Sequence, residues 1–238
     1  MTKRTTDSAI VLKTRPYRET SLMIDFFTRE HGRLRGVHKG YRGRRNQRRF
    51  QAFLAGRLDA SFGEGLASVY EFETTGNLVP PNSRMASGFY VLELTTRALY
   101  ERQNEPEVFD LIYAGLSDLG RLDYPENTVL RHVERSLLDT LGYGIDFAVS
   151  GRRRVEPLAP QAWYAFATGQ GFRRVDETRH GGKAYQGGDL LKIAAHDYSG
   201  TSGRVARELY QSALTALIGH QPLESRKLLQ ATAQNVEN

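Results

Sequence analysis

The sequence predicts an α+β protein in which a five-stranded barrel is followed by a helical bundle and a small C-terminal lobe. Short apolar or alternating segments fill residues 9–74, and glycine-marked bends between them leave no room for helical crossovers. Beyond Pro80-Pro81 the spacing of apolar residues changes to that of helices. The expected domains are residues 1–79, 80–148 and 149–238.

Five segments are expected to form the strands of the barrel. The second, TSLMIDFFT, is apolar on both faces, which is typical of a strand that is covered on both sides. Gly56 interrupts the fourth segment and marks a bulge or a bend. Residues 1–7 are polar and are expected to be frayed, and Pro16 is expected to end the first strand. The expected strands are residues 9–15, 20–28, 33–38, 50–62 and 66–74.

A small closed barrel of five strands is typical of an OB-fold, the barrel that binds oligonucleotides and oligosaccharides. An SH3-like barrel is the nearest competitor, and sequence alone separates the two poorly. The long basic insertion between the third and fourth strands favours the OB-fold.

Beyond the barrel, apolar residues recur at helical spacing. Three helices joined by short loops predict a small bundle, and Gly142 is expected to cap the third helix. Residues 151–188 are rich in glycine, arginine and aromatic residues without a clear period, so short strands or loops are expected there. The expected helices are residues 87–102, 106–119, 126–141, 204–218 and 222–230.

A localised basic block lies within residues 31–58. It holds nine lysines or arginines and no acidic residue, whereas the whole chain carries +6, so the remainder sums to −3. Such a block favours a polyanionic partner, because each cation can neutralise one phosphate. A solvated charged loop is the competing interpretation, and nucleic-acid binding is favoured over it. The candidate nucleic-acid-binding residues are Arg33, Arg35, Lys39, Arg42, Arg44, Arg45, Arg48 and Arg49.

Three other residues near this block are open to two interpretations. Tyr41 and Phe50 flank the arginines and could stack on bases, although each alone is more often a packing residue. Asp25 lies in an apolar strand, where a buried carboxylate needs a partner. A structural ion pair with an arginine is favoured for Asp25 over a catalytic role.

No motif in the sequence specifies a reaction, a metal or a cofactor. The chain has no cysteine, which excludes disulfides, thiolate catalysis and cysteine-ligated zinc or iron–sulfur sites. Its six histidines show no HExxH pattern, and no P-loop is present. We therefore expect no catalytic residue, no metal and no cofactor. The sequence also shows neither a signal peptide nor an apolar segment of membrane-spanning length, so a cytoplasmic protein without a membrane partner is expected.

Four segments carry a resemblance to a known family. They are AIVLKTRPYRETSLMIDFFTREHGRLRGVHKG (9–40), SGFYVLEL (87–94), LRHVERSLLDTLGYG (130–144) and PLESRKLL (222–229). They follow one another in family order across nearly the whole chain. In these segments the chain resembles the RecO family of bacterial DNA-repair recombination mediators. The resemblance implies an N-terminal OB-fold, a helical central domain and a small C-terminal lobe.

The resemblance also implies a function, a set of partners and a location. Family members bind single- and double-stranded DNA, anneal complementary strands and act without cleaving bonds. With RecR they help to load RecA onto DNA coated by the single-stranded DNA-binding protein (SSB). A nucleoid-associated location in the cytoplasm follows from this role. The basic residues named above would then be DNA-binding residues.

Two features of the family bear on individual residues of this chain. Many members carry a four-cysteine zinc site in the C-terminal lobe, which this chain cannot form, so aromatic packing is expected to stabilise residues 151–188. The family receives the acidic, Phe-ended tail of SSB on its helical domain, and such a tail needs an apolar pocket and a cation. The matching residues are Arg131 with Leu130, Val133 and Leu137. The competing interpretation of Arg131 is a surface arginine on a core-facing helix.

Two alternatives from other classes fit the residues without the resemblance. An OB-fold RNA-binding or ribosome-associated factor fits the composition and the charge equally well. A nuclease or other phosphotransferase would need clustered carboxylates, whereas those of the barrel are spread along its strands.

Overall fold

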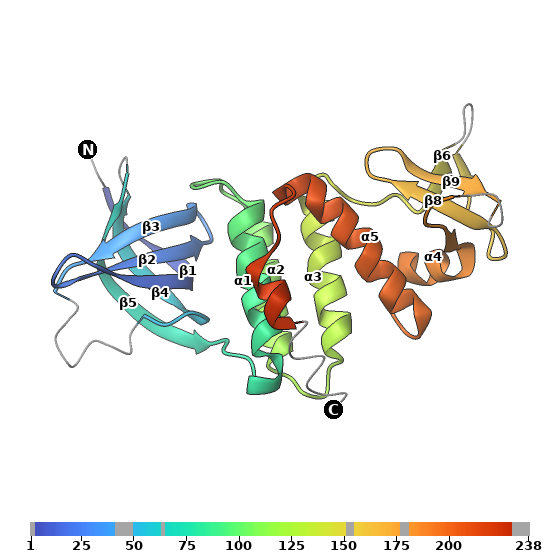
Figure 1. The fold of residues 1–238 in the computed structure, drawn as a ribbon. Coiled ribbons are helices and arrows are strands. Elements are labelled where there is room, and N and C mark those ends of the chain that lie inside the picture. The colour runs from blue at the N-terminus through green and yellow to red at the C-terminus, as the bar shows by residue number, and fades with distance from the viewer. Residues whose placement is uncertain (1–2, 41–49, 63–64, 151–154, 177–180, 230–238) are drawn as a thin grey trace. The chain divides into compact units, whose positions relative to one another are not determined.

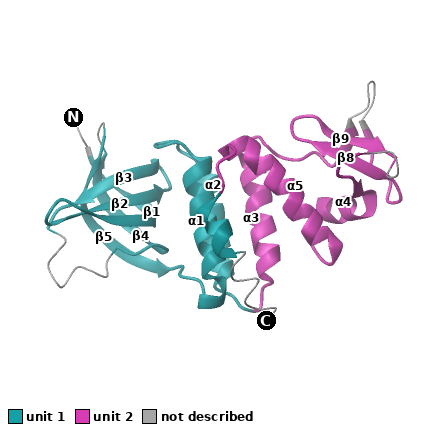
Figure 2. Ribbon diagram, viewed as in Figure 1, with its two compact units in different colours: residues 1–122, 223–238 teal, residues 123–222 magenta. Residues whose placement is uncertain are grey.

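The protein is described by a computed structural model. The residues that the structure describes are 3–40, 50–62, 65–150, 155–176 and 181–229. The chain forms two compact units, coloured separately in Figure 2. The first unit joins residues 1–122 with residues 223–238, and the second unit consists of residues 123–222. The chain therefore leaves the first unit and later returns to it.

Five strands of the first unit close into a barrel (Figure 1). Around the barrel the order is β1-β2-β3-β5-β4, and β1 pairs with β4 to close it. β3 and β5 are parallel, and the other neighbours are antiparallel. This order is that of an OB-fold, which confirms the predicted barrel type. The strands are β1 (Lys3–Tyr17), β2 (Ser21–Thr28), β3 (Gly32–His38), β4 (Leu54–Phe62) and β5 (Ala67–Asn77).

β1 extends beyond its predicted range at both ends. The expectation that residues 1–7 are frayed is wrong for residues 3–7, which pair with β4 from Lys3 opposite Phe62 onward. Pro16 does not end the strand, because it lies opposite Leu22 and pairing continues to Tyr17. The N-terminal half of β1 pairs with β4 and the C-terminal half with β2. Backbone pairing of this kind does not require apolar side chains, so composition did not reveal it.

β2 is buried on both faces, as its composition predicted. Ile24 and Phe26 belong to the core inside the barrel. Phe27 points the other way and lies against Phe109 of α2 (Pro106–Leu119), with the ring centroids 5.5 Å apart. A helix therefore covers the outer face of this strand. Burial of each such side chain contributes roughly 1.5–3 kcal/mol.

Gly56 lies at an irregularity in the pairing of β4 with β5, as predicted. The register shifts between Ala55 and Gly56. A Cβ atom added at Gly56 would lie 2.1 Å from the carbonyl oxygen of Glu73 on the neighbouring strand. The close approach of the two backbones at this bulge therefore requires glycine.

Two helices follow the barrel in the first unit. A short 3-10 helix, η1 (Asn82–Arg84), leads into α1 (Met85–Ala98), and α2 follows with the predicted bounds. α1 ends four residues earlier than the predicted range 87–102, because the chain becomes extended at Leu99 and turns back toward the barrel. The side chain of Arg84 is buried, and its Nη1 donates to the carbonyl oxygen of Arg121 at 2.8 Å, just beyond α2.

The described residues of the second unit form three helices and a small sheet. α3 (Glu126–Thr140) packs against α5 (Thr201–Ile218), and Gly142 follows α3 with φ +80°, as its predicted capping role requires. The sheet has the order β10-β8-β9-β6-β7, which confirms short strands in this region. Its strands are β6 (Ala148–Ser150), β7 (Val155–Pro157), β8 (Trp163–Ala167), β9 (Gly171–Val175) and β10 (Tyr185–Gln186).

One helix of the second unit, α4 (Gly187–Ala194), was not predicted. It begins with two glycines, which are poor helix formers and gave no sign of a helix in the sequence. Phe172 is buried and contacts both Phe147 and Phe166, which is the aromatic packing expected in place of a zinc site.

The three predicted domains stay a prediction. The two compact units are divided differently from the ranges 80–148 and 149–238, since α3 is grouped with α5.

The returning C-terminal segment docks on α1 through one carboxylate. Residues 224–229 are helical, within the predicted range 222–230. Glu93 of α1 accepts hydrogen bonds from the backbone N–H of Glu224 at 2.9 Å and that of Ser225 at 2.8 Å. The Ser225 hydroxyl donates to the same carboxylate. Glu93 thus satisfies N–H groups that a helix start leaves without intrahelical partners. Burial raises the pKa of Glu93, but these three hydrogen bonds outweigh that effect and lower the pKa overall.

Replacing Glu93 with Gln is expected to lower the free energy of unfolding by about 1–2 kcal/mol at pH 7, because charged hydrogen bonds are lost. The pKa of Glu93 is lowered in the folded state, so its contribution is complete above the ordinary value of 4.5 and disappears as the pH falls through the folded value. Urea unfolding from pH 7 to pH 3 should therefore show the two proteins converging below about pH 4.5.

The matched control is Glu19→Gln, since Glu19 is exposed in the turn between β1 and β2. A Glu93→Gln difference that stays constant across this pH range would contradict the assigned role.

Candidate nucleic-acid interface

The predicted nucleic-acid-binding residues fall into two groups. Arg33 and Arg35 lie on β3, and Lys39 is exposed in the turn that follows. The other candidates lie outside the described residues, as does Tyr41, and their assignment stays a prediction. They are Arg42, Arg44, Arg45, Arg48 and Arg49.

Arg33 is half-buried between the barrel and the end of α1. Its Nη1 donates to the carbonyl oxygen of Leu99 at 2.7 Å and also to that of Thr96. Carbonyls at a helix C-terminus lack intrahelical donors, and the helix dipole favours a cation there. Burial lowers the pKa of the Arg33 guanidinium, and the nearby carboxylates of Glu101 and Asp25 partly offset this effect. These contacts give Arg33 a structural role, and its DNA-binding assignment stays a prediction.

The backbone at the start of β3 contacts residues 99–103, the segment that follows α1. The N–H of Arg102 donates to the carbonyl oxygen of Arg33 at 2.7 Å. Gly32, at the start of β3, has φ +67°, and a Cβ atom added there would lie 1.9 Å from the carbonyl oxygen of Gln103. Only glycine allows this approach. The start of β3 and the segment 99–103 therefore form one close backbone junction.

Arg35 forms an ion pair across β2 and β3. Its Nε donates to Oδ1 of Asp25 at 2.8 Å, and its Nη2 lies 3.5 Å from Oε1 of Glu101. The pairing of Asp25 with an arginine is thus confirmed. The hydrogen bond to Asp25 is the largest cause of the raised pKa of Arg35. Two carboxylates offset the charge of Arg35, so less of its field reaches a phosphate than a count of charges suggests.

Phe50 does not stack on bases. Its side chain is 3% exposed and belongs to the barrel core. The ring lies against Phe26 and Phe72, with centroids 6.3 and 5.7 Å away. Packing, the competing interpretation, is correct for Phe50.

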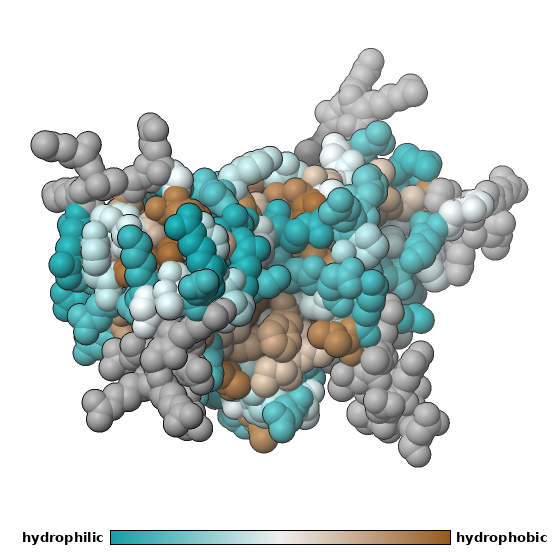
Figure 3. Space-filling view, turned by 60° about the vertical axis from the view of Figure 1, so that its left-hand side comes forward, coloured by the Kyte–Doolittle hydropathy of each residue, from teal (hydrophilic) through white to brown (hydrophobic). Residues whose placement is uncertain are grey.

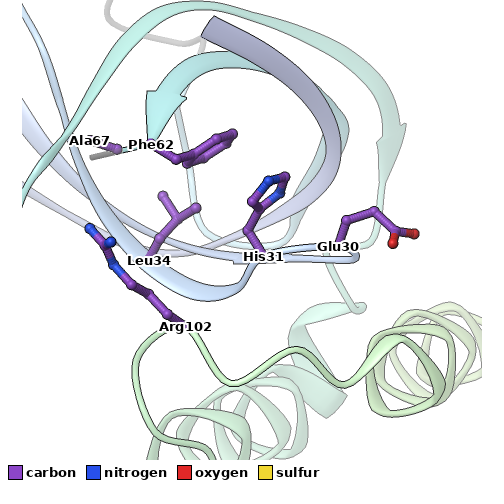
Figure 4. A pocket seen from close by; sticks show the side chains of 6 residues that line it. All are labelled: Glu30, His31, Leu34, Phe62, Ala67 and Arg102. Carbon is purple, nitrogen blue, oxygen red and sulfur yellow. The ribbon is translucent and has the colours of Figure 1, made fainter. Parts of the chain in front are cut away.

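A pocket opens at the end of the barrel where β3 begins (Figure 4). Its volume is about 190 Å³. The imidazole of His31 stacks on the ring of Phe62, with centroids 4.2 Å apart and planes 17° apart. Nδ1 of His31 lies 2.8 Å from Oδ2 of the buried Asp7. The pocket is lined by Glu30, His31, Leu34, Phe62, Ala67 and Arg102.

Sequence reasoning missed this pocket. His31 belongs to no sequence motif, and its partner Phe62 ends a different strand, β4. The two rings meet only because β1 pairs with β2 on one side and with β4 on the other. No spacing in the sequence carries that information.

The predicted SSB-tail residues lie on α3 in the second unit. Arg131 is not a surface residue, because its side chain is 4% exposed, and its Nη2 donates to Oε1 of Glu134 at 2.9 Å. Within the described part of the chain, its Nε and Nη1 have no hydrogen-bond partner. Leu130, Val133 and Leu137 are buried on the same helix. Their assignment as a binding site stays a prediction.

The surface over the barrel is largely hydrophilic in the view of Figure 3, with smaller hydrophobic areas between the charged side chains. Among the described residues, no helix is both long and apolar enough to cross a membrane. The same residues contain no group of three or more histidine or acidic side chains placed to hold a metal ion.

Two family descriptions match consecutive parts of the chain. Residues 1–78 match "Recombination protein O N terminal", and residues 83–226 match "Recombination protein O C terminal". The chain belongs to the RecO family. The N-terminal match covers the barrel. The C-terminal match covers α1 and α2 of the first unit together with the helices and the small sheet of the second unit.

Individual RecO relatives are similar over almost their full length. A protein of Pseudomonas paraeruginosa (strain DSM 24068 / PA7) is 36% identical over 235 residues, covering 96% of each chain. A protein of Actinobacillus pleuropneumoniae serotype 7 (strain AP76) is 31% identical over 229 residues, covering 94% of each chain. One from Pseudoalteromonas atlantica (strain T6c / ATCC BAA-1087) is 31% identical over 228 residues, covering 93% of this chain and 92% of the relative. Each is named DNA repair protein RecO.

Replacing Arg33 with Gln is expected to lower the free energy of unfolding of the first unit by about 2 kcal/mol, because a half-buried charged donor is lost from the end of α1. Lys39→Gln is the matched control, since Lys39 is exposed and its replacement should change stability by less than about 0.5 kcal/mol. Denaturant unfolding at pH 7 measures both. Equal stability of the two variants would show that Arg33 does not anchor the helix.

Proposed function

We propose that this protein is a recombination mediator that binds single- and double-stranded DNA and anneals complementary strands without cleaving bonds. With RecR it would help to load RecA onto SSB-coated DNA, at the nucleoid in the cytoplasm. The observation that carries the proposal is the match of both RecO descriptions to this chain. The basic block, which extends from β3 to β4 of an OB-fold, supports it, because such barrels are established oligonucleotide-binding scaffolds.

The proposed mechanism is charge neutralisation. Two strands repel one another through their phosphates, and a basic surface that binds both lowers this repulsion while releasing counterions. Arg33 and Arg35 are engaged by α1 carbonyls and by carboxylates. Most phosphate contacts are therefore assigned to Lys39 and to the arginines of residues 42–49.

Replacing Arg44, Arg45, Arg48 and Arg49 together with Gln is expected to weaken DNA binding and to slow annealing of complementary oligonucleotides, bare or SSB-coated. The slope of log K against log salt is negative, and its magnitude should decrease by up to about 3 for single-stranded DNA, because four phosphate contacts are removed. Fluorescence anisotropy across a salt series measures the slope, and a quenched-pair assay measures annealing.

The matched control replaces four exposed arginines of the second unit, which removes the same total charge. These are Arg173, Arg174, Arg204 and Arg207. A general effect of net charge would appear in both variants. Unchanged affinity of the first variant at moderate salt would contradict the assignment of the basic block.

We further propose that α3 receives the acidic, Phe-ended tail of SSB. A buried guanidinium with two N–H-bearing nitrogens that lack partners is a strong site for a carboxylate, which accepts bidentate hydrogen bonds from arginine. Leu130, Val133 and Leu137 would supply apolar surface for the phenylalanine. Because Arg131 is buried and paired with Glu134, tail binding would require its side chain or its neighbours to move.

Replacing Arg131 with Ala is expected to weaken binding of an SSB tail peptide by at least about tenfold, since a desolvated charged partner is removed. DNA affinity should stay unchanged. Isothermal titration with the peptide and anisotropy with DNA measure the two affinities, and circular dichroism verifies folding.

Two further variants sharpen this test. Arg131→Lys keeps the charge without the bidentate geometry and should have intermediate peptide affinity. Arg207→Ala, an exposed change in the same unit, should have no effect. Equal loss of peptide and DNA binding in a folded Arg131→Ala protein would contradict a separate tail site.

A further inference from the structure

The pocket at the end of the barrel combines an aromatic pair with an apolar floor and charged edges. We propose that it takes up one unstacked nucleobase of single-stranded DNA, an inference that rests on the DNA binding proposed above. The base would contact the His31–Phe62 pair and lie over Leu34 and Ala67. This contact is separate in kind from the phosphate contacts of the basic block.

The size and lining of the pocket favour a single flat heterocycle. At about 190 Å³ it is smaller than the roughly 300–1,000 Å³ of sites for drug-sized ligands. Leu34 is 6% exposed and Ala67 3%, so the floor is a fixed part of the barrel core. An apolar, aromatic-lined space of this size suits one ring system rather than a stretch of backbone.

The charges at the pocket suit a base better than a phosphate. Arg102 and Glu30 both line it, so a cation and a carboxylate are present together. A phosphate would be repelled by the carboxylate, whereas a base edge carries both hydrogen-bond donors and acceptors. Figure 4 shows the two side chains on different sides of the aromatic pair and the leucine.

The aromatic pair is held in place by a buried carboxylate. The side chain of Asp7 is 1% exposed, and it accepts from the N–H of Glu30 in addition to its contact with His31 Nδ1. The imidazole keeps 38% of its surface exposed while lying parallel to Phe62. A ring that is both positioned and partly open is the arrangement on which bases stack in single-strand-binding proteins.

Arg102 lies in the segment that follows α1 and reaches the pocket from there. Its φ is +64°, which is uncommon for a residue other than glycine. Its Nη2 donates to the carbonyl oxygen of Gly65 at 2.8 Å, so the side chain spans from the segment after α1 to the turn before β5. The guanidinium thereby forms one wall of the pocket.

A site of this kind distinguishes single-stranded from double-stranded DNA. Bases in a duplex are paired and stacked, and removing one from the stack costs a few kcal/mol, whereas a base in a single strand is freely available. The pocket would therefore add affinity for single strands only, while the basic block attracts both forms through their phosphates.

The test compares three ligands of equal length: a thymine-containing single strand, an abasic single strand and a duplex. Two variants without a change in formal charge alter the pocket: Phe62→Leu removes one ring and keeps apolar volume, and His31→Gln removes the other ring and keeps a donor for Asp7. Both should bind the thymine strand at least about five-fold more weakly than the unaltered protein, while the affinities for abasic strand and duplex stay unchanged.

His220→Ala is the matched control, because His220 is exposed in the second unit; it should bind all three ligands as the unaltered protein does. Circular dichroism establishes which variants are folded, and either folded pocket variant suffices. Unaltered affinity for the thymine strand, or an equal loss on the abasic strand, would overturn the base-binding pocket and leave DNA binding intact. Failure of the unaltered protein to bind any of the three ligands would overturn the proposed function itself.

Discussion

The first unit depends on the close junction between the start of β3 and the segment that follows α1. Gly32 permits the backbones to touch, and Arg33 satisfies the carbonyls at the end of the helix. A buried or half-buried cation at a helix C-terminus is favoured by both hydrogen bonding and the helix dipole. The junction fixes α1 against the barrel, and it also places Arg102 at the pocket beside β3.

How much each basic residue can contribute to binding a polyanion depends on its contacts within the protein as well as on its charge. Arg33 and Arg35 contribute to the basic block, yet both have strong partners within the first unit. Lys39 lies just beyond them and is exposed. The first part of the block therefore stabilises the fold, and the proposed DNA contacts fall on its later part.

The sequence was most informative where a local pattern determines the structure. Alternation and a doubly apolar strand led to the five strands, and α2 has its predicted bounds, because backbone periodicity is set by near neighbours. It was least informative where distant segments meet. The pairing of His31 with Phe62 and the burial of Arg131 depend on barrel closure and helix packing, which no short spacing encodes. Residues 3–7 show the same limit, since a polar segment became a strand through its partner.

The return of the C-terminal segment to α1 has a consequence for the order of events during synthesis. Residues 223–238 belong to the first unit but leave the ribosome after the whole of the second unit. The barrel can form early, whereas the carboxylate of Glu93 stays without Glu224 and Ser225 until the second unit has been synthesised. The first unit therefore stays incomplete until the second unit has been synthesised, and the second unit is an insertion whose two ends both lead back to the first unit.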